Sequence, residues 1–212
     1  MTEIIFILDR SGSMEGLEKD TIGGFNSMMK KQASVPGDAL VSTLLFDNDV
    51  EVIHDRLNIK DVPEMTSKEY YVRGCTALLD AVGGAIKHIS MIHKYARKED
   101  VPEKTLFIIT TDGMENASRR YSYEDVRSMV EHQKSKHGWE FIFLGANIDA
   151  QAEASKYGID ESMSVNYNCD SKGMEISFKV MDDVVSSYRS TCEVPKEWRK
   201  RIDDDFKSRG IL

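Results

Sequence analysis

The sequence predicts a doubly wound α/β fold: a mostly parallel sheet with one antiparallel edge strand and with helices on both faces. Continuous apolar runs, typical of strands buried on both faces, alternate along the chain with segments of helical periodicity. The 212 residues are enough for one domain with an extension. A hydrophobic fraction of 41% supplies a sizeable core, which excludes intrinsic disorder and fibrous repeats.

The first strand and the first helix are predicted near the N-terminus. Residues 4–8 form an apolar run that ends abruptly at Asp9, and we expect this run to be the central strand. After a polar turn over residues 10–13, apolar side chains recur at helical intervals up to about Gln32. Pro36-Gly37 then closes this strand, turn and helix unit.

A hairpin and a long helix are predicted next. Residues 40–46 and 50–54 are strand-like runs separated by Asp47-Asn48-Asp49, a spacing that suits a tight turn. One of the two strands should therefore be antiparallel and lie at a sheet edge. Residues 76–95 carry a single apolar stripe at helical spacing, which predicts a long amphipathic helix.

The second half of the chain continues the alternation of strands and helices. Further strands are predicted at residues 106–109, 140–144 and 162–165. Ser122 and Asp125 have the spacing of a capping box at the start of a helix. Two later helices are predicted at residues 149–157 and 178–188.

Charge and cysteine content limit the classes of partner and compartment. With 28 Lys and Arg against 36 Asp and Glu, the net charge is −8. The chain therefore lacks the positive field that would attract nucleic acids or anionic membranes. No apolar run approaches the length of a membrane span, and the N-terminus has no basic signal-peptide start, so we expect a cytoplasmic protein. Cys75, Cys169 and Cys192 form no Cys-x-x-Cys motif and are interpreted as free thiols.

Polar, oxygen-bearing residues follow the two longest apolar strands. Asp9, Ser11 and Ser13 follow the first strand, Asp112 follows the strand at residues 106–109, and Thr76 begins the long helix. The carboxyl ends of parallel strands share the edge where ligands bind in open α/β sheets. We therefore expect these five side chains to converge there.

Two carboxylates and three hydroxyls are hard ligands, which favour a hard divalent cation. A site that keeps water-filled positions suits Mg²⁺, or Mn²⁺, better than Ca²⁺. The expected mechanism is recognition: an ion with an open coordination position binds an Asp or Glu side chain of a partner protein.

At these motifs the sequence resembles the von Willebrand factor type A (vWA) domain with its metal-ion-dependent adhesion site (MIDAS). The resemblance is carried by three segments: Asp9-Arg10-Ser11-Gly12-Ser13-Met14, Gly74-Cys75-Thr76-Ala77-Leu78-Leu79-Asp80-Ala81 and Thr110-Thr111-Asp112-Gly113. The D-x-S-x-S motif, the threonine and the T-D-G aspartate of the family correspond to Asp9, Ser11, Ser13, Thr76 and Asp112.

The resemblance implies a Rossmann-like sheet, a bound Mg²⁺ and metal-mediated protein binding rather than catalysis. It implies a domain over residues 1–190. The remaining residues 191–212 are expected to form a helical extension packed on that domain, because apolar residues recur there at intervals of four. Cys75 departs from the family, in which glycine is common at this position.

Several alternatives remain open at the level of sequence. Ser13 and Thr76 can each be helix caps instead of metal ligands, and Cys75 can be a reactive thiol or an inert small residue. One segment can line a partner-binding rim or pack on the sheet edge: Tyr70, Tyr71 and Arg73. A second segment can line the rim or form a solvated loop: Glu115, Asn116, Arg119, Arg120 and Tyr121.

The alternative function is Mg²⁺-dependent phosphoryl transfer with Asp9 as nucleophile. Phosphatases resembling the haloacid dehalogenases carry D-x-D at the first strand, whereas this chain has Ser11 at the second acidic position. A third possibility is a scaffold in which the ion only stabilises the strand ends.

Overall fold

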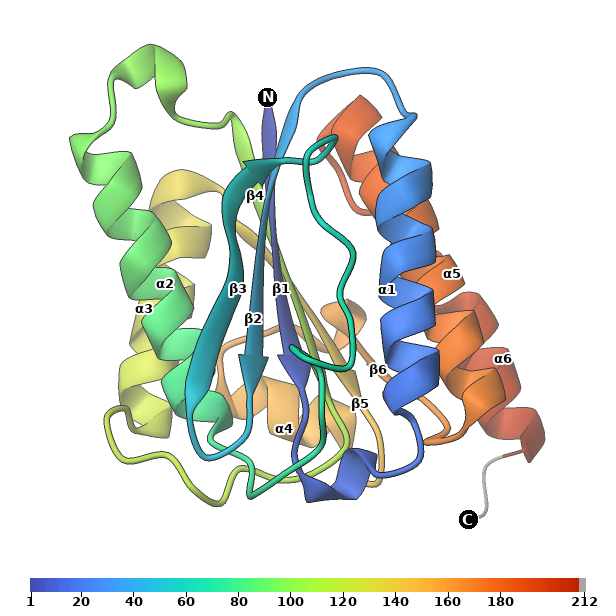
Figure 1. Cartoon of the computed structure of the whole chain (residues 1–212). Coiled ribbons are helices and arrows are strands. Elements are labelled where there is room, and N and C mark those ends of the chain that lie inside the picture. The colour runs from blue at the N-terminus through green and yellow to red at the C-terminus, as the bar shows by residue number, and fades with distance from the viewer. Residues whose placement is uncertain (210–212) are drawn as a thin grey trace.

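Six strands form one sheet at the centre of the computed structural model, which describes residues 1–209 (Figure 1). The strand order is β3-β2-β1-β4-β5-β6. Every neighbouring pair is parallel except β2 and β3, which are antiparallel at the edge. The strands are β1 (Thr2–Asp9), β2 (Ala39–Phe46), β3 (Val50–Asn58), β4 (Lys104–Thr111), β5 (Glu140–Gly145) and β6 (Ser164–Asn166). The predicted fold class, central strand and hairpin are confirmed.

Helices cover both faces of the sheet (Figure 1). One layer contains α1 (Glu18–Ala33), α5 (Ser171–Thr191) and α6 (Lys200–Arg209), and the other contains α2 (Leu78–Tyr95), α3 (Tyr123–His137) and α4 (Ala150–Lys156). Alternate residues of β1 point to opposite layers, so that Phe6 packs in the first core and Ile7 in the second. Three 3₁₀ turns complete the structure: η1 (Gly12–Met14), η2 (Lys98–Asp100) and η3 (Glu161–Met163).

The N-termini of α3 and α2 are set by different hydrogen bonds. The predicted capping box of α3 is present: Ser122 Oγ accepts a hydrogen bond from the Asp125 backbone N, and Asp125 accepts one from the Ser122 backbone N. The predicted helix at residues 76–95 begins two residues late, at Leu78. Ala77 has non-helical backbone angles, φ −92° and ψ 59°, and its backbone N donates to the Asp47 carbonyl, while the Thr76 backbone N donates to Asn116 Oδ1.

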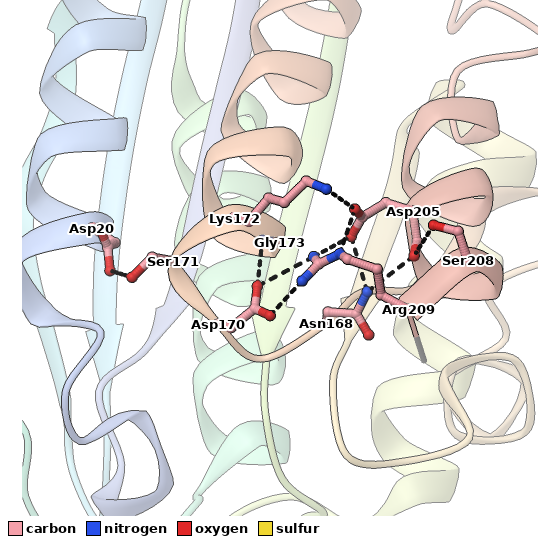
Figure 2. Close-up of polar contacts among 9 residues, drawn as sticks. All are labelled: Asp20, Asn168, Asp170, Ser171, Lys172, Gly173, Asp205, Ser208 and Arg209. Atoms are coloured by element: carbon pink, nitrogen blue, oxygen red, sulfur yellow. Dashed lines mark hydrogen bonds and ion pairs between the residues drawn. The ribbon is translucent and has the colours of Figure 1, made fainter. Parts of the chain in front are cut away.

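The helix α6 packs against α5 and β6. Trp198 Nε1, just before the helix, donates to the Ser162 carbonyl at 2.9 Å. At the end of α6, Arg209 forms ion pairs with Asp205 of the same helix and with Asp170, the N-cap of α5 (Figure 2). Residues 210–212 of the predicted extension 191–212 lie outside the described residues.

Within residues 1–209, no helix has both the length and the apolar character needed to cross a bilayer.

Candidate metal centre

The five predicted ligand residues lie where β1 and β4 end. Asp9 is the last residue of β1, and Asp112 directly follows β4. Ser11 precedes η1, Ser13 lies within it, and Thr76 precedes α2. β1 and β4 are parallel neighbours with Leu8 opposite Thr110, so their carboxyl ends meet at one edge. The lower end of the sheet in Figure 1 is this edge.

Short contacts link the serines to Asp112. Ser13 Oγ donates to Asp112 Oδ1 at 2.5 Å and lies 3.2 Å from Ser11 Oγ. Thr76 reaches the same place, because a Cβ added at Gly113 would lie 3.5 Å from Thr76 Oγ1 and 3.7 Å from Ser13 Oγ. The structure therefore brings these hydroxyls and the Asp112 carboxylate together.

Asp9 is held in place by the loop that follows it. The Ser11 backbone N donates to Asp9 Oδ1 and Thr111 Oγ1 donates to Asp9 Oδ2, both at 2.7 Å. The Tyr70 hydroxyl donates to the Asp9 carbonyl at 2.6 Å. Both carboxylate oxygens therefore have donors, and none of these donors carries a charge.

Burial disfavours the ionised forms of both aspartates. Asp9 and Asp112 are each only 1% exposed. Burial raises the pKa of Asp9 to about 6, although hydrogen bonds from Ser11 and Thr111 act in the opposite direction. Burial also raises the pKa of Asp112, against the hydrogen bond from Ser13. No basic side chain in the part of the chain that the structure describes lowers either pKa.

Arg10, the basic residue nearest to Asp9 in the sequence, forms its ion pairs away from Asp9 and Asp112. Its Nε donates to Asp47 Oδ2 and its Nη1 to Glu51 Oε2, each at 2.7 Å. Two buried carboxylates thus share an edge without a basic partner, and a divalent cation would supply the missing positive charge.

The donor set fits Mg²⁺ by its chemistry. Within residues 1–209, no group of three or more His, Cys, Asp or Glu side chains could hold a metal. The candidate centre has only two carboxylates and draws its remaining oxygens from hydroxyls. This composition suits an ion that prefers oxygen ligands and retains several water molecules, and it does not suit a thiolate or imidazole site.

Comparison with known proteins addresses the fold. No protein-family model matches the sequence, and no curated protein matches it. The von Willebrand factor type A structure from Catenulispora acidiphila is 16% identical, with a TM-score of 0.59 over 88% of this chain and 42% of that chain. The vWF domain of the type V pili tip protein Mfa5 from Porphyromonas gingivalis is 11% identical, with a TM-score of 0.62 over 92% of this chain and 98% of that chain. The chain has a vWA fold.

A third similar structure contains a metal. Proximal thread matrix protein 1 from the mussel byssus, with a zinc-occupied MIDAS motif, is 14% identical, with a TM-score of 0.54 over 88% of this chain and 48% of that chain. Several matched structures belong to longer chains, of which this chain spans 30% to 63%.

The capping interpretations of two candidate ligands are wrong. The N-cap of α1 is Leu17, not Ser13, and the N-cap of α2 is Ala77, which makes no side-chain capping bond. The hydroxyls of Ser13 and Thr76 are therefore not used to begin a helix of this vWA fold.

The loop after Asp112 is neither a free rim nor simply solvated. Glu115 Oε2 accepts from the Leu79 backbone N at 2.8 Å, and Asn116 Oδ1 accepts from the Thr76 backbone N at 2.9 Å. These two residues position Thr76 and the start of α2. Tandem polar residues after T-D-G were the only sequence signal for this role, and they also fit a solvated loop.

Tyr70 and Tyr71 have different roles: one packs in the protein and the other is exposed at the surface. Tyr70 is fully buried and packs in the core, whereas Tyr71 is 40% exposed. The Tyr71 ring contacts two guanidinium groups, with its centroid 5.2 Å from Arg10 Cζ and 5.3 Å from Arg73 Cζ. Only Tyr71 and Arg73 of this segment are therefore available as a rim.

Two cysteines lie near the candidate metal centre. Cys75 is exposed, and its backbone N donates to Asn48 Oδ1. Cys169 Sγ lies 3.8 Å from Asp112 Oδ2, and burial raises the pKa of its thiol to about 11. Sequence reasoning missed Cys169, because no motif connects it with a residue 57 positions away. All three cysteines are free, as predicted.

Proposed function

We propose that this chain is a protein-binding module that holds Mg²⁺ with Asp9, Ser11, Ser13, Thr76 and Asp112. One observation carries the proposal: two buried carboxylates and three hydroxyls gather at one edge of the sheet, and neither carboxylate has a basic partner. A bound divalent cation would compensate both carboxylates at once. Mn²⁺ has similar ligand preferences and is expected to substitute.

The ion provides a Lewis-acidic position for a partner's carboxylate. Hydroxyl ligands leave more positive charge on the ion than a full set of carboxylates, so an Asp or Glu side chain of another protein is the expected final ligand. The exposure of Ser13 makes this edge accessible to such a partner.

The similar structures support an adhesive role by analogy. One is a pili tip protein, and another carries zinc at a MIDAS motif, which supports a divalent ion at the corresponding edge here. We propose binding and not phosphoryl transfer, because Ser11 occupies the position at which a D-x-D phosphatase has its second acid.

Metal binding is tested by calorimetric titration of Mg²⁺ into the full chain. Asp112→Asn and Ser13→Ala are expected to weaken Mg²⁺ affinity by at least about ten-fold, since each removes a ligand. Asp49→Asn, in the β2–β3 turn at the same edge, is the matched control. Equal affinity in all four proteins would remove these residues from the metal site.

Partner binding needs a separate test. The immobilised chain should recover partner proteins in Mg²⁺ and lose them in EDTA or with Asp112→Asn. Recovery of the same partners after metal removal would contradict a metal-mediated mechanism.

A further inference from the structure

A separate cavity lies at the opposite edge of the sheet from the candidate metal centre. It has a volume of about 420 Å³ and is formed by the last turns of α2 and α3 together with the segments that lead into β4 and β5. This volume is within the range of small-molecule sites, roughly 300–1,000 Å³. Met91, Val101, Pro102 and Trp139 give it apolar walls.

The aromatic wall is held rigidly. Trp139 is buried, stacks on Phe107 with ring centroids 5.3 Å apart, and meets the edge of His93 at 5.4 Å. His93 Nε2 is in turn bonded to the fully buried Glu3 at 2.5 Å, and Glu3 also pairs with Arg56. A wall fixed in this way loses little conformational entropy when a ligand binds.

Gln133 adds a buried, unpaired polar atom beside the cavity. The residue lines the cavity and is only 7% exposed, and its side-chain Oε1 has no hydrogen-bond partner among the described residues. Buried polar atoms are nearly always paired, and an unpaired one costs about 1–3 kcal/mol. The terminal torsion of glutamine has two broad minima, so rotation can turn either the oxygen or the nitrogen of the amide toward a bound molecule.

The charge of the lining favours an anion. The cavity is lined by Lys94 and by His93, His132 and His137, and no acidic side chain of residues 1–209 lines it, although Glu3 lies behind His93 and the whole chain has a net charge of −8. Imidazole N–H and ammonium groups are hydrogen-bond donors that suit a carboxylate.

Two of the last carbonyl groups of α3 already accept backbone hydrogen bonds. The Gly138 backbone N–H donates to the Lys134 and Gln133 carbonyls, and the Trp139 backbone N–H donates to the Gln133 carbonyl, which caps the end of the helix.

We propose that this cavity binds a small aromatic carboxylic acid. Its ring packs against Trp139, its carboxylate is bound by Lys94, His132 and His137, and Gln133 pairs with a polar substituent or with the carboxylate itself. The site is independent of the metal centre, so either proposal can fail without the other.

Phenylacetate is a suitable probe, with neutral phenylacetamide as its isostere. In a Trp198→Phe background Trp139 is the only tryptophan, and its fluorescence should change saturably with a Kd below about 1 mM. Phenylacetamide should bind at least about ten-fold more weakly, because it lacks the charge.

Variants assign the residues. Gln133→Leu and His137→Ala are each expected to weaken phenylacetate binding several-fold, whereas His88→Ala, on α2 but outside the cavity, should leave it unchanged. Saturation-transfer NMR on the unaltered chain gives a second measurement that does not require the Trp198→Phe variant to fold. The proposal is overturned by an absence of saturable binding up to about 10 mM, by equal affinity for phenylacetamide, or by equal affinity of Gln133→Leu.

Discussion

Asp9 shows how the surroundings of one side chain prepare it for a cation. It is buried at the end of the central strand, and all the donors to its carboxylate are neutral. The ionised form is therefore held by hydrogen bonds but is not neutralised, which leaves the pKa of Asp9 raised to about 6. Arg10, which follows Asp9 directly, is committed to Asp47 and Glu51.

The stability of the metal-free protein should therefore depend on the ionisation of Asp9. Because burial raises its pKa from 3.8 to about 6, the stability that this group contributes is complete below pH 3.8 and is lost as the pH rises through about 6. The loss is on the order of 3 kcal/mol. Urea unfolding in EDTA should show this decline for the natural chain, and Asp9→Asn should abolish most of it.

Mg²⁺ should reverse the decline, since it binds the ionised carboxylate. The increase in Tm caused by Mg²⁺ is expected to be larger near pH 7.5 than near about pH 5, where Asp9 is largely protonated. A pH-independent increase would show that Asp9 does not contribute to metal binding.

At the scale of elements, the start of α2 depends on a loop 36 positions away in the sequence. No residue at the start of α2 provides a side-chain cap. Glu115 replaces that cap by accepting from the Leu79 backbone N, and it also accepts from the backbone N atoms of Ala117 and Ser118. One carboxylate therefore shapes its own loop and caps the neighbouring helix.

Glu115→Ala is expected to lower the free energy of unfolding by about 1–2 kcal/mol, because it leaves the Leu79 N–H of α2 and the Ala117 and Ser118 N–H groups of the loop without an acceptor. The comparison is urea unfolding against Glu124→Ala, an exposed glutamate in the first turn of α3. If both variants lose the same stability, Glu115 has no special role in capping α2.

Arg209 links α6 to the start of α5 through a compact polar network (Figure 2). Its Nη1 lies 2.6 Å from Asp170 Oδ2, and Nη2 lies 2.5 Å from Asp205 Oδ2. Asn168 Nδ2 donates to the same Asp205 carboxylate at 2.9 Å. Arg209 holds the pKa of Asp205 at about 2. The network thus joins α6 to the loop that carries Cys169 beside Asp112.

Arg209→Ala should speed amide hydrogen exchange in α6 and in residues 168–172, because it removes the ion pairs between these segments. Arg201→Ala is the matched control on the same helix, since the pair of Arg201 with Asp183 is exposed on both sides. Identical exchange in both variants would show that the Arg209 network does not fasten α6.

The strands and most helices could be predicted because their signals are local. Buried parallel strands are continuous apolar runs, and Ser122 with Asp125 marks a helix start within four residues. The convergence of Ser13 with Asp112 was also predictable, because both residues follow the carboxyl ends of strands in a mostly parallel sheet. The roles of Glu115 and Cys169 and the unpaired Gln133 could not be predicted, because they depend on how distant segments pack.

At the scale of the whole molecule, Glu3 ties together three elements. This carboxylate is fully buried in β1 and contacts Arg56 of β3 and His93 of α2, each at 2.5 Å. Sheet centre, sheet edge and one helical layer therefore meet at a single side chain. A charge group of this kind is costly to break from its buried member, because the partly buried Arg56 and His93 side chains then lose their common partner.

Glu3→Ala is expected to destabilise the chain by about 3–5 kcal/mol in urea unfolding. The exposed Glu64→Ala should change stability by less than about 0.5 kcal/mol. A loss below about 1 kcal/mol for Glu3→Ala would show that the cluster contributes little beyond an exposed ion pair.

The pairing of β1 with β4 also sets an order of events during synthesis. Ser13 and Asp112 are 99 positions apart, so a nascent chain exposes Asp9, Ser11, Ser13 and Thr76 before the residue that completes the set has left the ribosome. Contacts between residues so far apart in sequence form late in folding compared with local contacts. We therefore expect Mg²⁺ to bind after the domain has folded and not to nucleate its folding.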